Sequence, residues 1–307
     1  VIGQPETRIR HAYDIIGKNK DDHTHFQIRM PEVSGARDRW VAAGCGVHVT
    51  VATAAVDRAA PVRDDPPTGE DLEDVTAGES TTNLLAASWQ PAFCESKPSK
   101  DECEALNAGN LPHAEGRFSI HGLWPQPRGN DYCGVPRRVK NLDKPSTWHL
   151  LPAPGTDAET TAALAVAMPG VASHLHHHEW IKHGTCYGGD GGADEYYDDT
   201  LALMAALEAS PVGQLFAENV GNELDAGAIR AAFDAGFGAG AGDRVKIDCL
   251  RDRDSGRTLI VELKINLQGE IDVVDGAVDM GPLILAADPV GDPGCSGGIV
   301  DPGGDQR

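Results

Sequence analysis

The sequence predicts an α+β fold, and two observations support this prediction. Segments with the alternation of strands and segments with the spacing of helices follow one another in mixed order, without the regular strand–helix alternation of a parallel α/β sheet. The 307 residues are 40% apolar, which is enough to bury one large core, or a medium core and a small second one. No run of eighteen apolar residues occurs, so we expect no membrane partner.

The first 60 residues predict a small β-rich accessory domain. HFQIRM at 25–30 alternates polar and apolar residues, and RWVAAGCGVHVTVA at 39–52 combines β-branched residues with glycine. Residues 61–81 lose large apolar side chains and gain proline, glycine and acidic residues, which is typical of a linker. We therefore expect an accessory domain at 1–60, a linker at 61–81 and a second domain at 82–307.

The second domain begins with strands and continues with helices. NLLAASW at 83–89 and RFSIHGLW at 117–124 have the composition of strands. DAETTAALAVA at 157–167 predicts a helix, because its acidic start favours the helix dipole and Pro169 stops it. A new helix can begin at Val171.

The later part of this domain also contains both predicted helices and predicted strands. Helical spacing recurs in ADEYYDDTLALMAALEA at 193–209 and in ELDAGAIRAAFDAG at 223–236. RVKIDCL at 244–250 and TLIVELKINL at 258–267 predict two strands around a DRDSGR turn. Residues 286–307 are rich in glycine, proline and aspartate, and a single cysteine is their only obvious anchor.

The formal net charge of −21 argues against a broad nucleic-acid-binding face. Duplex binding normally shows as a basic patch or stripe. We therefore expect no DNA-specific binding, and any polyanion has to be bound locally. The acidic surface itself is typical of solubility or of adaptation to salt.

The seven cysteines are widely spaced and include no C-x-x-C pair, so they do not resemble a zinc knuckle or ribbon. A set of disulfides is the better interpretation. Disulfides indicate an oxidising compartment, so we expect a secreted or periplasmic protein.

HHHEWIKHGTC at 176–186 concentrates groups that titrate or carry charge. If residues 171–183 are helical, each residue advances by about 100°, and Trp180 and Ile181 fall on one side where they can face a core. Four polar residues then share the remaining arc: His178, Glu179, Lys182 and His183.

A zinc site and an acid–base site are the alternatives for this arc. The H-E-x-x-H zinc motif needs histidines four residues apart, whereas His178 and His183 stand five apart, with Lys182 between them. We therefore expect no metal and no other cofactor. An imidazole with an ordinary pKa of about 6.5 can serve as acid or base, and a lysine beside it suits phosphoryl chemistry. Such chemistry requires a second histidine from elsewhere.

The other histidines of this region have simpler interpretations. His176 and His177 are expected at a solvated, histidine-rich helix end, with adventitious metal binding as the alternative. His174 is expected to be structural.

FSIHGLWPQ at 118–126 places a histidine at the end of an apolar strand, before Gly, Leu, Trp and Pro. Together, FSIHGLWP and HEWIKHGTC closely resemble the two active-site segments of the ribonuclease T2 family of secreted endoribonucleases. SWQPAFC at 88–94, MPG at 168–170 and IRAAFDAGFG followed by VKIDC are weaker matches. The resemblance runs from about residue 82 to about 300 and implies a central antiparallel β-sheet flanked by helices.

The resemblance also implies the roles of five residues. His121 and His183 would be the acid–base pair, His178 would bind the scissile phosphate, and Glu179 and Lys182 would stabilise the transition state. The nucleophile would be the 2′-hydroxyl of the RNA, so no metal is needed, and the products would be a 2′,3′-cyclic phosphate and then a 3′-phosphate. Single-stranded RNA is the expected substrate, because an A-form duplex resists splaying of its bases.

Trp124 and Gln126 are the expected substrate-binding residues outside this set. The corresponding tryptophan of the family stacks on a base, which contributes about 1 to 3 kcal/mol without demanding a sequence, and core packing is the alternative for Trp124. Many members have an acidic residue where this chain has Gln126, and an aromatic residue where it has Leu175. Low base specificity is therefore expected, and the base preference stays open.

The resemblance implies a disulfide between Cys133 and Cys186. Cys94–Cys103 is a plausible local bridge, Cys249–Cys295 would hold the glycine-rich tail, and Cys45 is left over. We expect a monomer. Two other classes compete with the ribonuclease interpretation: a binding module that kept the fold, which normally loses one of the two catalytic histidines, and a zinc hydrolase, which chelation would inactivate.

Overall fold

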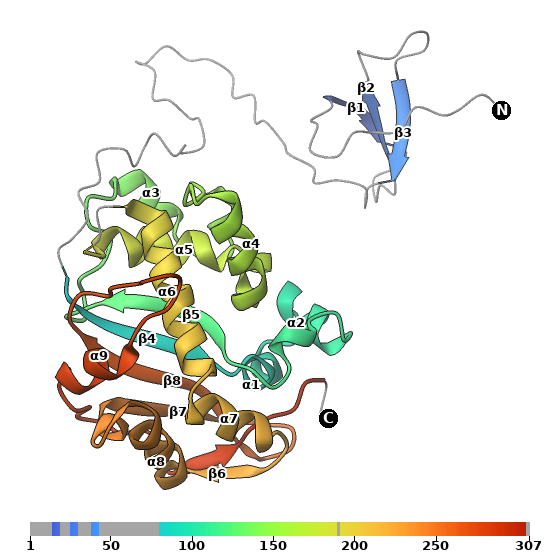
Figure 1. Ribbon diagram of the computed structural model, residues 1–307. Helices are drawn as coiled ribbons and strands as arrows, with labels where there is room; N and C mark the ends of the chain where they lie inside the picture. Colours follow the sequence, from blue (N-terminus) through green and yellow to red (C-terminus); the bar gives the residue numbers. More distant parts are fainter. Residues whose placement is uncertain (1–13, 19–24, 30–37, 43–79, 189–190, 305–307) are drawn as a thin grey trace. The chain divides into compact units, whose positions relative to one another are not determined.

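The computed structural model describes residues 14–18, 25–29, 38–42, 80–188 and 191–304. The chain divides into two units, Val1–Arg63 and Asp64–Arg307, and each is described by itself. The described part of the first unit is an antiparallel sheet in the order β1-β2-β3 (Figure 1). Its strands are β1 Asp14–Lys18, β2 His25–Arg29 and β3 Asp38–Ala42.

β2 confirms the strand predicted in HFQIRM, and Ile28 within it is buried. The strand predicted at 39–52 is present as far as Ala42. Cys45 and most of the predicted linker lie outside the described residues. The accessory domain at 1–60 therefore stays a prediction.

The second unit is built on a six-stranded sheet in which the strand order is β5-β4-β8-β9-β6 and β7 also pairs with β8. The four longest strands, β4, β5, β7 and β8, are those that the sequence predicts. The bounds are β4 Thr82–Ser88, β5 Ser119–Pro125, β6 Glu223–Asp225, β7 Val245–Arg251, β8 Thr258–Gln268 and β9 Gly297–Ile299.

The sheet is mainly antiparallel, as predicted, and one parallel pair makes it mixed. All strand pairs in it are antiparallel except β8 and β9, which run parallel and pair through Leu259 and Ile299. The sequence contains no signal for β9, because Gly297 and Gly298 have no side chains that could alternate. A Cβ atom at Gly297 would lie 2.3 Å from the carbonyl oxygen of Leu224, so the close approach of β6 requires glycine there.

Helices pack around this sheet, and α6 packs on β5 (Figure 1). Their packing is fixed in part by Tyr196 of α6, whose hydroxyl donates to the carbonyl of Leu123 at 2.9 Å. The α-helices are α1 Gln90–Ser96, α2 Asp101–Asn107, α3 Arg137–Leu142, α4 Ala158–Ala167, α5 Leu175–Lys182, α6 Gly192–Glu208, α7 Pro211–Glu218, α8 Ala226–Phe237 and α9 Met280–Ala286. Short 3₁₀ turns are η3 Pro112–Ala114, η4 Trp148–Leu150, η5 Pro169–Ser173, η6 Gly184–Cys186 and η7 Ala241–Arg244.

The main core lies between the sheet and helices that both precede and follow α5 in the chain, among them α4, α6, α7 and α8. The rings of Trp89, Phe118 and Phe216 meet within 5.4 Å of one another in this core. Within the described ranges, no single helix is long and apolar enough to cross a membrane. The pair α6–α7, bent by 63°, meets that test by length and composition alone.

The predicted helix at 157–167 is confirmed as α4, and Asp157 caps it by accepting a hydrogen bond from the Thr160 amide at 2.8 Å. The single helix predicted over 171–183 is wrong. The chain forms η5 as far as Ser173, turns through a left-handed His174 with φ 60°, and only then begins α5. A left-handed residue cannot continue a right-handed helix, so α5 has just two turns.

All three expected disulfides are present: Cys94–Cys103, Cys133–Cys186 and Cys249–Cys295. Cys133–Cys186 joins the loop after β5 to η6, which directly follows α5. The two sequence motifs are therefore linked covalently.

Candidate active site

His121 occupies a bulge in β5. Ala86 of β4 faces Gly122 and Ala87 faces Ile120, so His121 is the extra residue between them. A bulge bends its strand and changes the direction of a side chain. The His121 side chain is 36% exposed, whereas Ile120 is buried in the core.

Glu262 binds one ring nitrogen of His121. Its Oε2 lies 2.5 Å from Nδ1 of His121 and accepts a second hydrogen bond from the Ser88 hydroxyl at 3.1 Å. Its Oε1 lies 3.1 Å from Nζ of Lys264, two residues further along β8 and on the same face. Burial opposes ionisation of Glu262, but the hydrogen bond from His121 holds its pKa below the ordinary value. Glu262 thus accepts a hydrogen bond from Nδ1 of His121. The other ring nitrogen, Nε2, is the one that can act on a substrate.

Glu179 is the buried centre of the site, with an exposed fraction of 1%. Its Oε2 accepts a hydrogen bond from Nε1 of Trp124 at 2.8 Å. Its Oε1 lies 3.9 Å from Nε2 of His121 and 3.7 Å from Nε2 of His178. A Cβ atom at Gly122 would lie 1.9 Å from Glu179 Oε2, which explains the glycine that follows His121.

Asp143 holds His178 in place from the opposite side. Its Oδ1 lies 2.6 Å from Nδ1 of His178 and accepts from Nε1 of Trp148 at 2.8 Å. Its Oδ2 accepts from the Tyr132 hydroxyl at 2.6 Å. The Trp148 ring also stacks on His178, with centroids 4.6 Å apart. The Asp143 side chain is fully enclosed, so this carboxylate is committed to orienting its three neighbours.

Lys182 ends α5, and His183 follows it. On an α-helix, the directions of residues 178 and 183 differ by about 140°. The His183 amide still donates to the carbonyl of Glu179 at 2.9 Å, as in a continuing helix, and the two imidazole centroids lie 6.2 Å apart. The His183 ring also lies 5.4 Å from that of Trp124.

The pKa values of His121 and His183 shift in opposite directions. Burial lowers the pKa of His121, but the hydrogen bond to Glu262 and the negative charge of Glu179 outweigh it, so the pKa is raised. Burial, together with the nearby Lys182 and His178, lowers the pKa of His183 to about 3. At mildly acidic pH, His121 is therefore protonated while His183 is neutral.

Ligand atoms of His178, Glu179 and His183 all lie within 4.8 Å of one another. The separation of His178 and His183 by five residues therefore does not by itself exclude a metal site in three dimensions. Lys182 is close enough to affect the pKa of both Glu179 and His183, and its positive charge disfavours a cation there. That no metal is needed stays a prediction.

A cavity of about 620 Å³ opens beside these groups. His183 and Lys182 line it, together with Trp124 and Gln126, the two predicted substrate-binding residues. Lys264 also lines it, and its Nζ lies 5.6 Å from the centre of the Trp124 ring. The structure thus brings the predicted catalytic and base-binding residues to one place.

The remaining histidines do not form a solvated helix end. His174, His176 and His177 are half-buried and contact one another, and burial lowers the pKa of each. His177 also places Nδ1 3.0 Å from the carbonyl oxygen of Leu151.

Sequence reasoning missed Glu262, Asp143 and Lys264. Glu262 and Lys264 look like ordinary outward-facing residues of a strand, and Asp143 lies in a short polar loop. The signal that could have found Glu262 is its i, i+2 spacing from Lys264 in an otherwise apolar strand.

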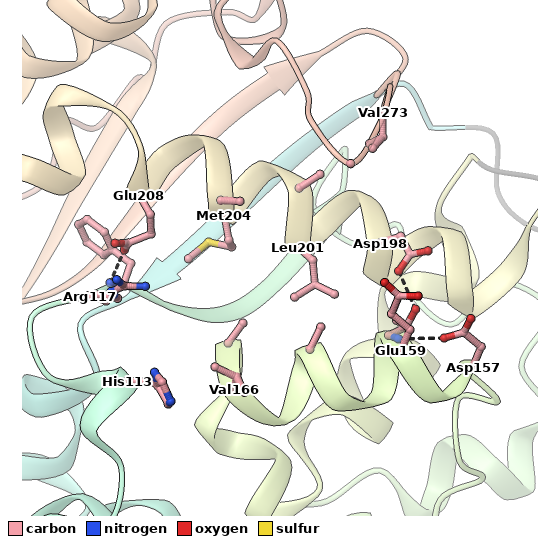
Figure 2. Close-up of a pocket in the computed structure, with 17 residues that line it drawn as sticks. His113, Arg117, Asp157, Glu159, Val166, Asp198, Leu201, Met204, Glu208 and Val273 are labelled. Atoms are coloured by element: carbon pink, nitrogen blue, oxygen red, sulfur yellow. Dashed lines mark hydrogen bonds between the residues drawn. The ribbon is translucent and has the colours of Figure 1, made fainter.

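A second cavity, of about 690 Å³, lies between α4 and α6 (Figure 2). Apolar side chains such as Leu201 and Met204 line its middle, Arg117 and Glu208 lie at one end, and Asp198 lies at the other. It contains none of the predicted site residues, so the smaller cavity is the candidate active site.

The chain is similar to known proteins over more than half of its length. A sequence model of the Ribonuclease T2 family matches residues 81–275. Ribonuclease I of Escherichia coli K12 is 28% identical over 218 residues, which cover 63% of this chain and 77% of the relative. A ribonuclease of Aeromonas hydrophila is 32% identical over 113 residues, or 36% of this chain and 40% of the relative.

Solved structures are similar as well. A crystal structure of an RNase MC1 variant with 5′-GMP has a TM-score of 0.46 and 20% identity over 72% of this chain and all of its own. Actibind, a T2 ribonuclease, has a TM-score of 0.44 and 15% identity over 78% of this chain and 96% of its own. On the match of the family model to more than half of its length, the chain belongs to the ribonuclease T2 family and is a T2-type endoribonuclease.

Proposed function

We propose that the protein cleaves single-stranded RNA by metal-independent transphosphorylation, with the 2′-hydroxyl of the RNA as nucleophile. The observation that supports this most strongly is the opposite shift of the His121 and His183 pKa values at one site. The reaction needs a base and an acid at the same pH, and a neutral His183 and a protonated His121 supply them.

In the first step, His183 removes the proton of the 2′-hydroxyl, and the 2′-oxygen bonds to phosphorus. The bond between phosphorus and the 5′-oxygen breaks, and His121 donates a proton to that oxygen. This step produces a 2′,3′-cyclic phosphate and a free 5′-hydroxyl. In the slower second step the roles reverse: His121 takes a proton from water, the water oxygen bonds to phosphorus, and His183 protonates the leaving 2′-oxygen to give a 3′-phosphate.

The other three catalytic residues, His178, Glu179 and Lys182, bind or stabilise charged groups. His178 would bind the scissile phosphate, and the Lys182 ammonium beside His183 would stabilise the negative charge that develops on the phosphoryl oxygens. Glu179, whose own pKa burial raises, lies between Nε2 of His121 and Nε2 of His178 and would stabilise the cationic form of His121. Glu262 and Asp143 are positioning residues, which act through the histidines that they bind.

Trp124 and Gln126 would contact the base in the 620 Å³ cavity. The Trp124 ring offers a stacking surface that accepts any base. Gln126 is uncharged and already donates to the carbonyl of Trp124 at 3.0 Å. Both features favour low base specificity, and the need to insert a base favours single-stranded RNA.

The disulfides fit an oxidising compartment. We therefore propose that the protein acts as a secreted or periplasmic monomer, with residues 1–60 as an accessory domain. DNA would not be cleaved, because it has no 2′-hydroxyl, and we expect no DNA-specific binding.

Three substrates test the mechanism: a single-stranded RNA, the same RNA with one 2′-deoxy position, and the matching DNA, each incubated with EDTA. We expect cleavage of the RNA to fragments that end in 2′,3′-cyclic phosphate, no cut after the deoxy position and no cleavage of DNA. Cleavage after the deoxy position would overturn the proposal, because the nucleophile would then come from elsewhere.

A metal-dependent hydrolase is the second candidate, favoured by the approach of His178, Glu179 and His183 ligand atoms to within 4.8 Å. It predicts complete loss of cleavage in EDTA and recovery with added Zn²⁺. The transphosphorylation mechanism predicts the same rate with and without EDTA.

A further inference from the structure

Positive charge is concentrated in one segment of this acidic chain. The whole chain has 26 Lys and Arg residues against 47 Asp and Glu residues. Residues 128–144, which we call the cationic segment, reverse this ratio with five basic and two acidic residues. The basic residues are Arg128, Arg137, Arg138, Lys140 and Lys144.

The exposed surface of the cationic segment carries a larger excess of positive charge than its residue count indicates. All five basic side chains are exposed. Of the two acidic residues, Asp143 is enclosed and uses its carboxylate on His178, Trp148 and Tyr132. Asp131 is half-buried. Solvent therefore meets a surface that carries mainly positive charge.

The cationic segment is attached to the candidate active site at three points. Arg128 lines the same cavity as His183. The Tyr132 amide donates to the carbonyl of Lys182 at 2.8 Å, and the next residue forms the Cys133–Cys186 disulfide. Asp143 binds His178. The exposed cations of α3 therefore lie in a stretch of chain that is tied to the site at both ends.

Packing holds α3 with its basic residues toward solvent. Val139 is fully buried and packs in one cluster with Trp148 and with Ile181 of α5. Arg138 and Lys140, on either side of Val139, are exposed. Nζ of Lys140 lies 4.2 Å from the centre of the Tyr132 ring, a cation–π contact that fixes this lysine beside the residue bonded to Lys182.

We propose that the cationic segment binds the phosphates of the RNA strand that flank the cleaved bond. This inference rests on the proposed function for the identity of the ligand. A single strand presents a phosphate at every nucleotide, and a group of exposed cations can bind such a backbone along its length without reading its sequence. The segment provides the local positive surface without which a protein of net charge −21 would repel a polyanion.

The test compares two triple variants of the full chain. Arg137→Gln, Arg138→Gln and Lys140→Gln together neutralise the exposed face of α3. Lys97→Gln, Arg251→Gln and Arg253→Gln together remove the same charge from exposed positions outside the segment and the cavity. Binding is measured by fluorescence anisotropy with a long 2′-O-methyl oligoribonucleotide, which has no free 2′-hydroxyl and stays intact whatever the cleavage activity.

We expect the α3 variant to bind the oligonucleotide at least about tenfold more weakly at low salt, and the slope of log Kd against log salt to fall by about two, or ~0.7 for each lost phosphate contact. The control variant should bind nearly as the wild type does. Equal weakening in both variants would overturn the proposal, because it would show an effect of net charge alone. Unchanged binding by the α3 variant would overturn it directly.

Cleavage of a dinucleoside monophosphate separates this inference from the proposed function. Such a substrate has no flanking phosphates, so the α3 variant should cleave it at the wild-type rate while its kcat/KM on long RNA falls. The wild type could also bind the oligonucleotide through α3 and yet cleave neither substrate. That result would contradict the proposed function but would still support the cationic segment as a binding surface.

Discussion

Nδ1 of His121 and Oε2 of Glu262 lie 2.5 Å apart, although 141 residues separate them in the chain. The contact exists because Ser88 of β4 pairs with Ser119 of β5 on one side and with Glu262 of β8 on the other. The bulge at His121 then turns the imidazole toward β8. An ionised carboxylate at this distance fixes the ring orientation and raises the pKa of the histidine.

Glu262→Gln should lower kcat by about 10- to 100-fold, the usual cost of losing a partner that orients a functional histidine. The amide has to direct its NH₂ group either at Lys264 or at His121, both of which donate to the native carboxylate. The pKa of His121 should fall as well, and with it the alkaline limb of the pH–rate profile. Asp248→Asn is the matched control, since Asp248 accepts from Lys264 at 2.6 Å without contacting His121. An unshifted alkaline limb would contradict the positioning role.

The wild-type pH dependence of kcat/KM should be bell-shaped. Activity requires neutral His183, so it is lost as the pH falls through about 3, the pKa to which burial and Lys182 lower this group. Activity also requires protonated His121, so it is lost as the pH rises through a pKa above the ordinary value of about 6.5. The optimum is thus acidic to near neutral. Initial rates on a dinucleoside monophosphate, with circular dichroism at each pH as a folding control, measure this profile. A rate that rises continuously into the alkaline range would exclude His121 as the acid.

Asp143→Asn should mainly raise KM, whereas Asp143→Ala should also lower the free energy of unfolding. Asparagine keeps an acceptor for His178 but removes the charge, so KM should rise about 10-fold while the fold survives. Alanine leaves the donors on His178, Trp148 and Tyr132 without an acceptor, and each buried orphan costs about 1 to 3 kcal/mol of the free energy of unfolding. Chemical denaturation together with steady-state kinetics separates the two effects. Equal stability of both variants would mean that Asp143 is not the structural acceptor described here.

A shortened chain of residues 79–307 should fold and retain cleavage of a dinucleoside monophosphate. Every proposed site residue lies within 80–304, and Ser80 at its start donates to the carbonyl of Gln126 at 2.9 Å. Thermal unfolding and dinucleotide cleavage of the shortened and full chains make the comparison. Loss of dinucleotide cleavage would show that the first 78 residues contribute to the chemistry.

The sequence predicts the strands and helices that have a strong hydrophobic alternation or a clear capping residue. The alternation in TLIVELKINL predicts β8, and Asp157 correctly marks the start of α4. It fails at β9, where glycine carries no pattern, and at His174, where a single left-handed residue shortens the helix to two turns.

The five proposed catalytic residues could be named in advance because they lie in two long motifs. Their positioning partners could not, because Glu262 and Asp143 reach the histidines through strand register and loop packing rather than through local spacing. The helical geometry used for the second motif correctly placed His178 and His183 on one arc, but it could not give the distance between their rings, which lie 6.2 Å apart.

The most direct test of the central claim is the initial rate of single-stranded RNA cleavage in EDTA by the wild type, His121→Ala and His183→Ala. Each acid–base step typically contributes about 10² to 10⁴ in rate, so each variant should lose nearly all activity while keeping its fold. His178→Ala and Lys182→Ala should lose less. The wild type should cleave at the same rate with and without EDTA. Wild-type rates in both histidine variants, or abolition of wild-type cleavage by EDTA alone, would contradict an acid–base mechanism carried by His121 and His183.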